Sequence, residues 1–265
     1  MRNLITITTD FGVRDHFVGA MKGVILAINP DANLLDISHD VASFSVVDGA
    51  FTIAQAYAYF PPDTVHMVVV DPGVGGERRP ILVQAGRHFF VGPDNGVFSF
   101  IYEREERITV RHITAAHYFL QPVSRTFHGR DIFSPIAAWL TKGIEASKFG
   151  EPISDYQRIV SLNPTIESEK RARGMVLKAD KFGNLITNFS IALFPQFVQP
   201  QPPVFRLDIR GQQLTRLRQT FGEGAPGEVF AIVGSSGYLE LVCNNAAASQ
   251  ALNAGSGDDI VLTFG

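Results

Sequence analysis

The sequence predicts an α/β protein of two domains. An N-terminal layered α/β domain with a central, mostly parallel sheet is followed by a smaller C-terminal all-β barrel domain. Three observations lead to this prediction: strand and helix patterns alternate through the first half, a polar segment follows, and short strand patterns separated by Gly/Pro turns fill the remainder. We expect the domains at 1–155 and 174–265, with a linker at 156–173.

The first half is predicted to run strand, helix, strand, helix, strand. Apolar residues recur at helical spacing from Phe17 until Pro30 stops the helix. The last of these strands is apolar without alternation in its final four residues, which is typical of the centre of a sheet covered on both faces. Ligands gather beyond the carboxyl ends of the strands in such sheets. The expected strands are 4–9, 33–37 and 64–70, and the second helix is 43–60.

The C-terminal part shows a different pattern. The stretch around ESEKRAR is polar and charged, which indicates a solvated connection. Beyond it, turns such as QPQPP and GEGAPG separate short β patterns, which favours a barrel. The expected strands are 174–178, 204–209, 229–233, 238–242 and 260–264.

Composition limits the function. Apolar residues make up 45% of the 265 residues and charged residues 18%, which is globular composition. A net charge of −3 provides no electrostatic footprint for nucleic acid or an anionic membrane. A single cysteine, Cys243, can form no internal disulfide or cysteine-based metal site. With no signal-peptide or membrane-span pattern, we expect a soluble, cytoplasmic protein.

Two strand ends carry candidate functional residues. TTDFG at 8–12 and VVVDPGVGG at 68–76 place Asp10 and Asp71 where a strand stops, each followed by glycine that lets the backbone turn or approach a ligand. Either aspartate alone is equally well explained as a helix N-cap or a turn residue. Two of them at the expected ligand edge favour a site.

Two further clusters lie in the motifs TFHGRD and DKFGN. His128 is flanked by glycine and arginine in a polar loop, whereas Asp131 can be the N-cap of the helix that follows it. Asp180 and Asn184 flank Phe182 in a turn, where they could bind an amine or a hydroxyl against an aromatic ring. A Ser/Gly turn opens the last cluster, GSSGYLELVCNNAAAS at 234–249, which suits a nucleobase edge.

Several familiar chemistries are excluded by spacing. GVGGER lacks the Lys-Ser/Thr of a phosphate loop, and DPGVGG lacks the third glycine and the acidic partner of a dinucleotide fingerprint. There is no G-x-S-x-G elbow. Too few histidines and carboxylates converge for a metal phosphoesterase.

Six motifs taken in order, TTDFG, VVVDPGVGGER, GPDNG, TFHGRD, DKFGN and SSGYLEL, resemble the S-adenosyl-L-methionine hydroxide adenosyltransferase family, which is related to fluorinase and chlorinase. The resemblance covers both domains. It implies that water displaces methionine at the ribose C5′, giving adenosine and L-methionine. It also implies no metal or cofactor, and a homotrimer with sites at subunit interfaces.

The resemblance implies that Asp71, Arg78 and His128 form the water site. A carboxylate and an imidazole can accept hydrogen bonds or the proton, while a guanidinium stabilises developing hydroxide. The halogenases carry tyrosine at the position of Asp71, since a carboxylate beside a halide in a water-poor pocket would cost several kcal/mol. Asp71 therefore favours water as the nucleophile.

The other motifs match substrate positions of the family. Asp10 is expected to bind the ribose hydroxyls, and Asp180 and Asn184 the methionine amino group. Ser235 and Ser236 are expected near the methionine carboxylate, although the halogenases have arginine at the position of Ser236. The remaining expected substrate contacts are Phe11, Asn95, Phe127, Phe182, Tyr238, Glu240 and Val242.

Two other functions remain open from the sequence. A non-catalytic sensor of S-adenosyl-L-methionine or adenosine would keep the binding residues but would not need Asp71, Arg78 and His128 together. An adenosyl transferase using halide would keep the fold and change the nucleophile. A purely structural protein would leave six ordered motifs unexplained.

Overall fold

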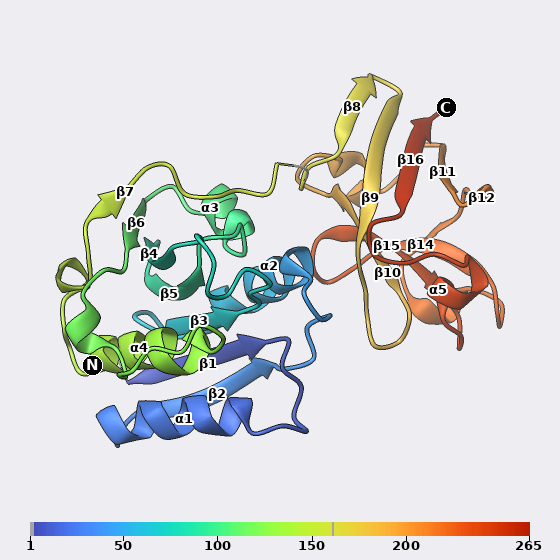
Figure 1. Ribbon diagram of the computed structural model, residues 1–265. Helices are drawn as coiled ribbons and strands as arrows, with labels where there is room; N and C mark the ends of the chain where they lie inside the picture. Colours follow the sequence, from blue (N-terminus) through green and yellow to red (C-terminus); the bar gives the residue numbers. More distant parts are fainter. Residues whose placement is uncertain (1–2, 161) are drawn as a thin grey trace. The chain divides into compact units, whose positions relative to one another are not determined.

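The computed structural model describes residues 3–160 and 162–265, and the chain divides between Ile159 and Val160 into two compact units (Figure 1). Each unit has its own sheet and its own hydrophobic core. The predicted mixed α/β class is confirmed at this level. Within the expected linker at 156–173, residues 165–168 form a strand and residue 171 begins the next strand. Residue 161 of this linker lies outside the described residues.

The sheet of the first unit has the order β2-β1-β3-β5-β4-β6-β7. Within the described residues, β1 is parallel to β2 and β3, and β3 is parallel to β5, whereas β4 is antiparallel to β5 and β6, and β6 to β7. The strands are β1 (Leu4–Thr9), β2 (Asn33–Ser38), β3 (Val65–Val69), β4 (Pro80–Ala85), β5 (His88–Pro93), β6 (Ile108–His112) and β7 (Pro152–Ile153).

The prediction of a mostly parallel sheet is therefore correct only for β2, β1, β3 and β5. A two-residue turn with Gly86 at φ 55° joins β4 to β5, and a connection this short allows only an antiparallel hairpin. The hairpin strands were not predicted from the sequence.

Helices cover both faces of this sheet (Figure 1). On one face, α1 (Phe17–Ile28) and α4 (Ser134–Thr141) pack into one core with the strands. On the other lie α2 (Val46–Ala56) and α3 (Ser99–Arg104), joined by an edge-on ring contact between Phe51 and Phe100. The Ser45 hydroxyl accepts a hydrogen bond from the Asp48 N–H and so caps α2, which starts and ends inside the predicted 43–60.

The parallel pairing of β1, β3 and β5 places their carboxyl ends at one edge of the sheet. Asp10 follows β1, Asp71 follows β3 and Asp94 follows β5. Three of the sequence motifs therefore meet at the edge where ligands bind in open α/β sheets.

A buried imidazole pair lies in the α2 face of the sheet. His66 is fully buried, its Nδ1 is 2.7 Å from the Thr6 hydroxyl and its Nε2 is 3.3 Å from His88 Nδ1. Burial, with a smaller contribution from His88, lowers the pKa of His66 from 6.5 to about 3. His66 is therefore neutral in the folded protein.

We expect the protein to lose stability in mild acid because of His66. The unfolded chain binds more protons than the folded chain between pH 6.5 and about 3, so stability falls as the pH drops through this window. At pH 4.5 the loss from this group is about 2 to 3 kcal/mol. Urea unfolding at pH 7.5 and 4.5 measures it, and His66→Phe should show a smaller difference between the two pH values; an equal difference would contradict this assignment.

The second unit is a curled half-barrel whose sheet has the order β12-β11-β16-β9-β10-β15-β14-β13. Its apolar core includes Phe189, Leu241 and Leu262. Edge strand β8 pairs with β9, where Glu167 forms ion pairs with Arg171 and Arg173. The charged run ESEKRAR is largely solvent-exposed, as predicted, but it forms a hairpin rather than a connection between the domains. The main strands are β8 (Thr165–Ser168), β9 (Arg171–Ala179), β10 (Leu185–Ser190), β11 (Phe205–Ile209), β14 (Val229–Val233), β15 (Tyr238–Cys243) and β16 (Asp259–Phe264), with short β12 (Gln212–Leu214) and β13 (Leu217–Arg218) at the ends.

Residues 3–160 and 162–265 include no helix with the length and apolar character needed to cross a membrane.

Candidate active site

The first unit brings together the three residues predicted to form the water site. Arg78 donates from Nε to Asp71 Oδ1 over 2.9 Å and from Nη2 to Asp71 Oδ2, so the two side chains form a bidentate ion pair. Nη2 also lies 2.7 Å from His128 Nδ1. The pair is buried, with 9% of the Arg78 side chain and 4% of the Asp71 side chain exposed. The Arg78 guanidinium therefore links the Asp71 carboxylate to the imidazole of His128, which is far from both residues in the sequence.

A glycine turn allows this convergence. The turn between β3 and β4 is closed by hydrogen bonds from Val74 N to Asp71 O and from Gly76 N to Gly73 O. Gly75 has φ 75°, and a Cβ there would lie 2.0 Å from the carbonyl oxygen of Arg125. Only glycine lets the turn approach the segment that leads into His128.

His128 lies at the start of a π-helical turn, Gly129–Phe133, that continues into α4. The expectation that Asp131 caps the following helix is wrong. Asp131 is fully buried inside the π turn, where its carboxylate accepts a hydrogen bond from Ser124 N over 2.8 Å and pairs with Arg130. Asp131 therefore fixes the loop before His128, and π turns of this kind are common at functional sites.

The contact with Arg78 determines the tautomer of His128. A guanidinium only donates hydrogen bonds, so His128 Nδ1 must be the acceptor and the neutral ring carries its proton on Nε2. Burial and then the Arg78 charge lower the pKa of His128, outweighing the opposite effects of Asp71 and Asp131. At neutral pH His128 is thus a neutral imidazole that can donate from Nε2.

Arg78 keeps one donor unused. Its Nη1 is buried and has no hydrogen-bond partner among the described residues. A buried cationic N–H without an acceptor is costly, so an oxygen atom of a ligand is the expected partner. The cluster can therefore supply two donors, Arg78 Nη1 and His128 Nε2, beside the carboxylate of Asp71.

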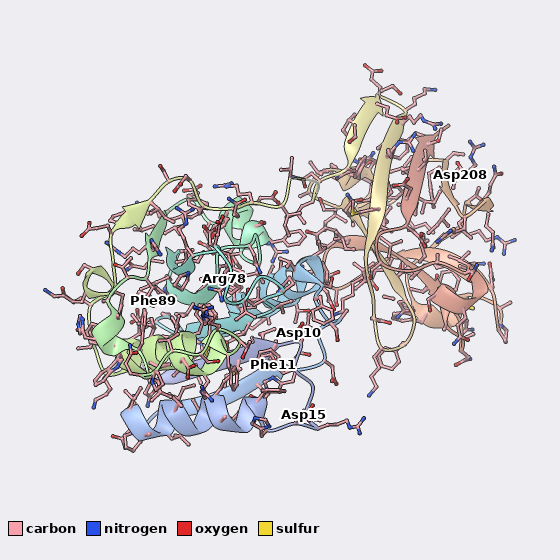
Figure 2. The ribbon with its side chains drawn as sticks, viewed as in Figure 1. Asp10, Phe11, Asp15, Arg78, Phe89 and Asp208 are labelled. Atoms are coloured by element: carbon pink, nitrogen blue, oxygen red, sulfur yellow. The ribbon has the colours of Figure 1, made fainter. Side chains whose placement is uncertain are left out.

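Asp10 marks a second polar feature at the same unit's ligand edge (Figure 2). Its Oδ2 accepts a hydrogen bond from the backbone N–H of Phe44 over 2.8 Å. Phe44 has φ 66° and is 73% exposed, an unusual conformation and environment for a bulky aromatic residue. The positive φ of Phe44 was not predicted from the sequence, because neither Phe44 nor the serine on each side of it is a residue type that signals a positive φ.

Phe11 and Phe127 form an aromatic group beside these residues. Their ring centroids lie 6.1 Å apart, and each also contacts Phe17. The Phe127 ring stacks under the guanidinium of Arg130. Phe127 is 8% exposed and Phe11 is half-buried, so Phe11 offers more surface to a ligand.

Asn95 also lies at this edge, but its polar atoms form internal bonds. Its Nδ2 donates to the Val70 carbonyl over 2.9 Å, and its Oδ1 accepts from Val97 N. Its side chain fixes the end of β3, next to Asp71.

In the second unit, the DKFGN motif folds as a turn around Asp180. Asp180 Oδ1 accepts from the backbone N–H groups of Phe182 and Asn184, and Oδ2 accepts from Asn184 Nδ2 over 2.9 Å. Asn184 therefore orients Asp180, and the Phe182 ring is 75% exposed. A cavity of about 530 Å³ lies beside this turn, and its lining includes Phe182, Asn184, Phe221, Cys243 and Asn244.

The serine turn of the second unit is partly engaged. The Ser236 hydroxyl lies 3.2 Å from Glu240 Oε1 and donates to it, whereas Ser235 is exposed. Burial raises the pKa of Glu240, which is 8% exposed. The Val242 side chain is fully buried in a small apolar cluster, so only its backbone can reach a ligand, and Tyr238 is half-buried.

Among the described residues, no group of three or more His, Cys, Asp or Glu side chains could hold a metal ion. The water-site residues and Asp10 belong to the first unit, and the Asp180 turn and serine turn belong to the second.

Comparison with known families gives the chain its classification. Residues 5–150 match the SAM hydroxide adenosyltransferase N-terminal domain, and residues 174–261 match the C-terminal domain of the same family. The chain belongs to the SAM hydroxide adenosyltransferase family. The family resemblance predicted from six motifs is therefore confirmed.

Relatives of this SAM hydroxide adenosyltransferase family protein span its full length. It is 35% identical to a protein named (R)-S-adenosyl-L-methionine hydrolase from Salinispora tropica, with 98% of both chains covered. It is 22% identical to a fluorinase from Nocardia brasiliensis, with 100% of this chain and 98% of the relative covered. An uncharacterized conserved protein from Thermotoga maritima has a similar structure, with a TM-score of 0.89, 35% identity and coverage of 98% of this chain and 99% of the other.

Proposed function

We propose that this protein hydrolyses S-adenosyl-L-methionine to adenosine and L-methionine by attack of water at the ribose C5′. The observation that carries the proposal is the Asp71–Arg78–His128 cluster, in which the Arg78 cation lies within hydrogen-bond distance of both a proton acceptor, Asp71, and an oriented imidazole, His128. Names of relatives at 32–38% identity support the same reaction.

Asp71 is the proton acceptor in this proposal. His128 cannot take the proton at Nδ1, which faces the Arg78 guanidinium, or at Nε2, which already carries a proton. Each Asp71 oxygen has a further lone pair beyond the bond from Arg78. His128 therefore orients the water by donating from Nε2, and Arg78 Nη1 stabilises the developing hydroxide.

The reaction balances without a general acid. A bond forms between the water oxygen and C5′ as the C5′–S bond breaks, and its electron pair stays on sulfur. The sulfonium thereby becomes the neutral thioether of methionine, and the water proton passes to Asp71 and then to solvent. The chemistry needs no metal or organic cofactor, because Arg78 supplies the positive charge.

Water is a better fit than halide for this cluster. The ionised carboxylate of Asp71 would repel a halide in a water-poor site, whereas it accepts a hydrogen bond from water. The identity to fluorinases is lower, at 22–23%, than the identity to the hydrolases, at 32–38%.

Substrate binding in the first unit is proposed to centre on Asp10. Oδ2 is engaged by the Phe44 N–H, which leaves Oδ1 and the second lone pair of Oδ2 for the ribose 2′ and 3′ hydroxyls. The exposed ring of Phe44 and the ring of Phe11 are suited to pack against the nucleoside.

The second unit is proposed to hold the amino acid and the base. Asp180, oriented by Asn184, binds the methionine ammonium, and the neighbouring cavity beside Phe182 accepts adenine. Because the Ser236 hydroxyl donates to Glu240, Ser235 is the better candidate for the methionine carboxylate. Tyr238 and the backbone at Val242 border the base.

The sulfonium sulfur is a stereocentre, and the hydrolases at 32–38% identity are named for its (R) form. We extend the proposal to the (R) epimer as the preferred substrate. The protein is further proposed to be a cytoplasmic homotrimer whose sites form at subunit interfaces, with the C-terminal unit as a barrel-like domain. Light scattering should then give three times the chain mass of 29.0 kDa.

The direct test is chromatography of metal-free protein incubated with each sulfonium epimer in halide-free buffer. Adenosine and methionine should appear in equal amounts, faster from the (R) epimer, and His128→Ala should abolish them. Binding without turnover would favour the sensor, and turnover only with added chloride would favour the halide transferase.

The pH dependence of kcat/KM should report His128. Its pKa lies below 6.5 because of burial and Arg78, and protonation at Nδ1 would place a proton against the guanidinium. We therefore expect kcat/KM to stay constant as the pH falls through 7 and to drop only below 6.5. An acid limb centred above pH 7 would contradict this assignment of His128.

A further inference from the structure

The turn that carries Asp71 and Arg78 is fixed at both of its ends by two adjacent residues, Asp94 and Asn95, of the GPDNG motif. The turn follows Val70, the residue after β3, and enters β4 through Arg79. Asp94 and Asn95 follow β5, the strand that pairs with both β3 and β4. They are therefore adjacent to both ends of the turn.

Asn95 holds the first end. Its Nδ2 donates to the carbonyl of Val70 over 2.9 Å, one residue before Asp71. Its Oδ1 accepts from Val97 N over 3.2 Å, which fixes the orientation of the amide. The Nδ2 atom donates a hydrogen bond and the Oδ1 atom accepts one. An aspartate carboxylate has no donor, so it would lose the hydrogen bond to Val70.

Asp94 holds the second end. Its Oδ2 accepts from Arg79 Nε over 3.0 Å and from Arg79 Nη2 over 2.7 Å, and its backbone N–H donates to the Arg79 carbonyl over 2.8 Å. The Asp94 side chain is 2% exposed. The two consecutive arginines thus have separate partners: Arg78 binds Asp71 and His128, whereas Arg79 binds the GPDNG motif.

The last segment of the first unit closes this arrangement. Asp94 Oδ1 accepts from Gln157 N over 2.7 Å, and Arg79 donates from Nη1 to the Asp155 carboxylate over 2.8 Å. Ile159 N donates to the Ser99 hydroxyl over 2.8 Å. Asp94 is therefore bonded on both oxygens and has no freedom to follow a movement of the turn.

We propose that Asp94 and Asn95 are positioning residues that act as a clamp on the catalytic turn. The proposal rests on the proposed function. The clamp keeps Asp71 and Arg78 in the bidentate geometry that the water site requires, and it touches neither the water nor the substrate. Displacements of about 1 Å in such a site can cost about 10²-fold in rate, so this geometry has to be held by neighbouring bonds.

Asn95→Asp is the variant that tests the clamp. It preserves the size of the side chain but replaces the donor to Val70 with an acceptor. We expect kcat to fall by about 10- to 100-fold, with KM and the Kd for adenosine within about twofold of the wild-type values. Asn33→Asp, an exposed change on β2, is the matched control and should leave all three constants unchanged.

A double-mutant cycle distinguishes positioning from a structural role. If Asn95 acts through the turn, Asn95→Asp should have little further effect on kcat in an Arg78→Lys background. Additive losses would overturn the proposal. A raised KM with unchanged kcat would overturn it too, since that result would make Asn95 a substrate contact.

Hydrogen exchange measured by mass spectrometry tests the clamp without any turnover. Peptides covering residues 70–79 contain the hydrogen-bonded amides of Val74 and Gly76, and these should exchange faster in Asn95→Asp. Arg79→Lys, which loses the fork to Asp94, should give the same local change if Asn95→Asp fails to fold. Unchanged exchange in the folded variant would overturn the clamp. Failure of the wild type to hydrolyse S-adenosyl-L-methionine would instead contradict the proposed function. In that case the hydrogen-exchange result alone would show whether Asp94 and Asn95 hold the turn.

Discussion

Asp71→Asn should abolish hydrolysis while leaving nucleoside binding intact. The substitution preserves the shape of the side chain but removes the negative charge and the proton acceptor. It also directs an amide N–H toward the Arg78 guanidinium, which has no acceptor to offer. Since general-base catalysis contributes about 10²- to 10⁴-fold, and the ion pair is lost as well, we expect kcat to fall by about 10³-fold or more.

The measurement is single-turnover adenosine formation together with calorimetric titration of adenosine. Asp71→Asn should bind adenosine within about twofold of wild type, because Asp71 contacts the water rather than the nucleoside in this mechanism. Asp208→Asn, an ion-paired carboxylate of the second unit labelled in Figure 2, is the control and should retain full activity. Turnover of Asp71→Asn at the wild-type rate would mean that another group accepts the proton.

Arg78→Lys should be nearly as damaging although the charge is kept. The guanidinium bonds both oxygens of Asp71 and the Nδ1 of His128 at once, and it has a further buried donor at Nη1. An ammonium group is a compact charge without this planar fork, so it cannot make all of these contacts. We expect kcat to fall by about 10²- to 10³-fold.

The pH profile gives Arg78→Lys a second readout. With the guanidinium removed, His128 Nδ1 loses the donor that fixes its tautomer, so the acid limb of kcat/KM should move. Arg206→Lys, whose arginine pairs with Asp208 on β11, provides the matched control. An unchanged kcat and pH profile in Arg78→Lys would contradict the role of the fork.

The family resemblance implied the three water-site residues, and the structure brings their side chains together. Asp71 follows an apolar strand, and the glycines after it allow the sharp turn that returns Arg78 to the carboxylate. His128 was singled out by its glycine and arginine neighbours, and the structure places its ring against Arg78. Arg78 and His128 lie far apart in the sequence. Their contact requires the turn at Gly75 to pack against the backbone carbonyl of Arg125, and only the structure shows that packing.

Other features depend on tertiary contacts that leave little local signal. The β4–β5 hairpin was missed, although a two-residue turn at Gly86 joins its strands, so the sheet was predicted to be more parallel than it is. The positive φ of Phe44 is stabilised by a bond to Asp10, more than thirty residues away. Asp131 resembles an N-cap in sequence but is buried within a π turn.

The substrate residues show the same limit. Asn95 was predicted to contact substrate from its motif, whereas its side chain bonds to Val70 and Val97. Ser236 was expected beside the methionine carboxylate, which stays a prediction, and its hydroxyl donates to Glu240. A motif places a type of residue at a position, but the direction of its polar side chain depends on partners supplied by other strands.

Hydrolysis in H₂¹⁸O tests the central claim, attack of water at C5′, most directly. The mechanism predicts adenosine with one ¹⁸O atom, located in the 5′-hydroxyl group, and unlabelled methionine, with both products lost in Asp71→Asn. Unlabelled adenosine, or label in any other product, would contradict attack of water at C5′ and with it the roles assigned to Asp71, Arg78 and His128.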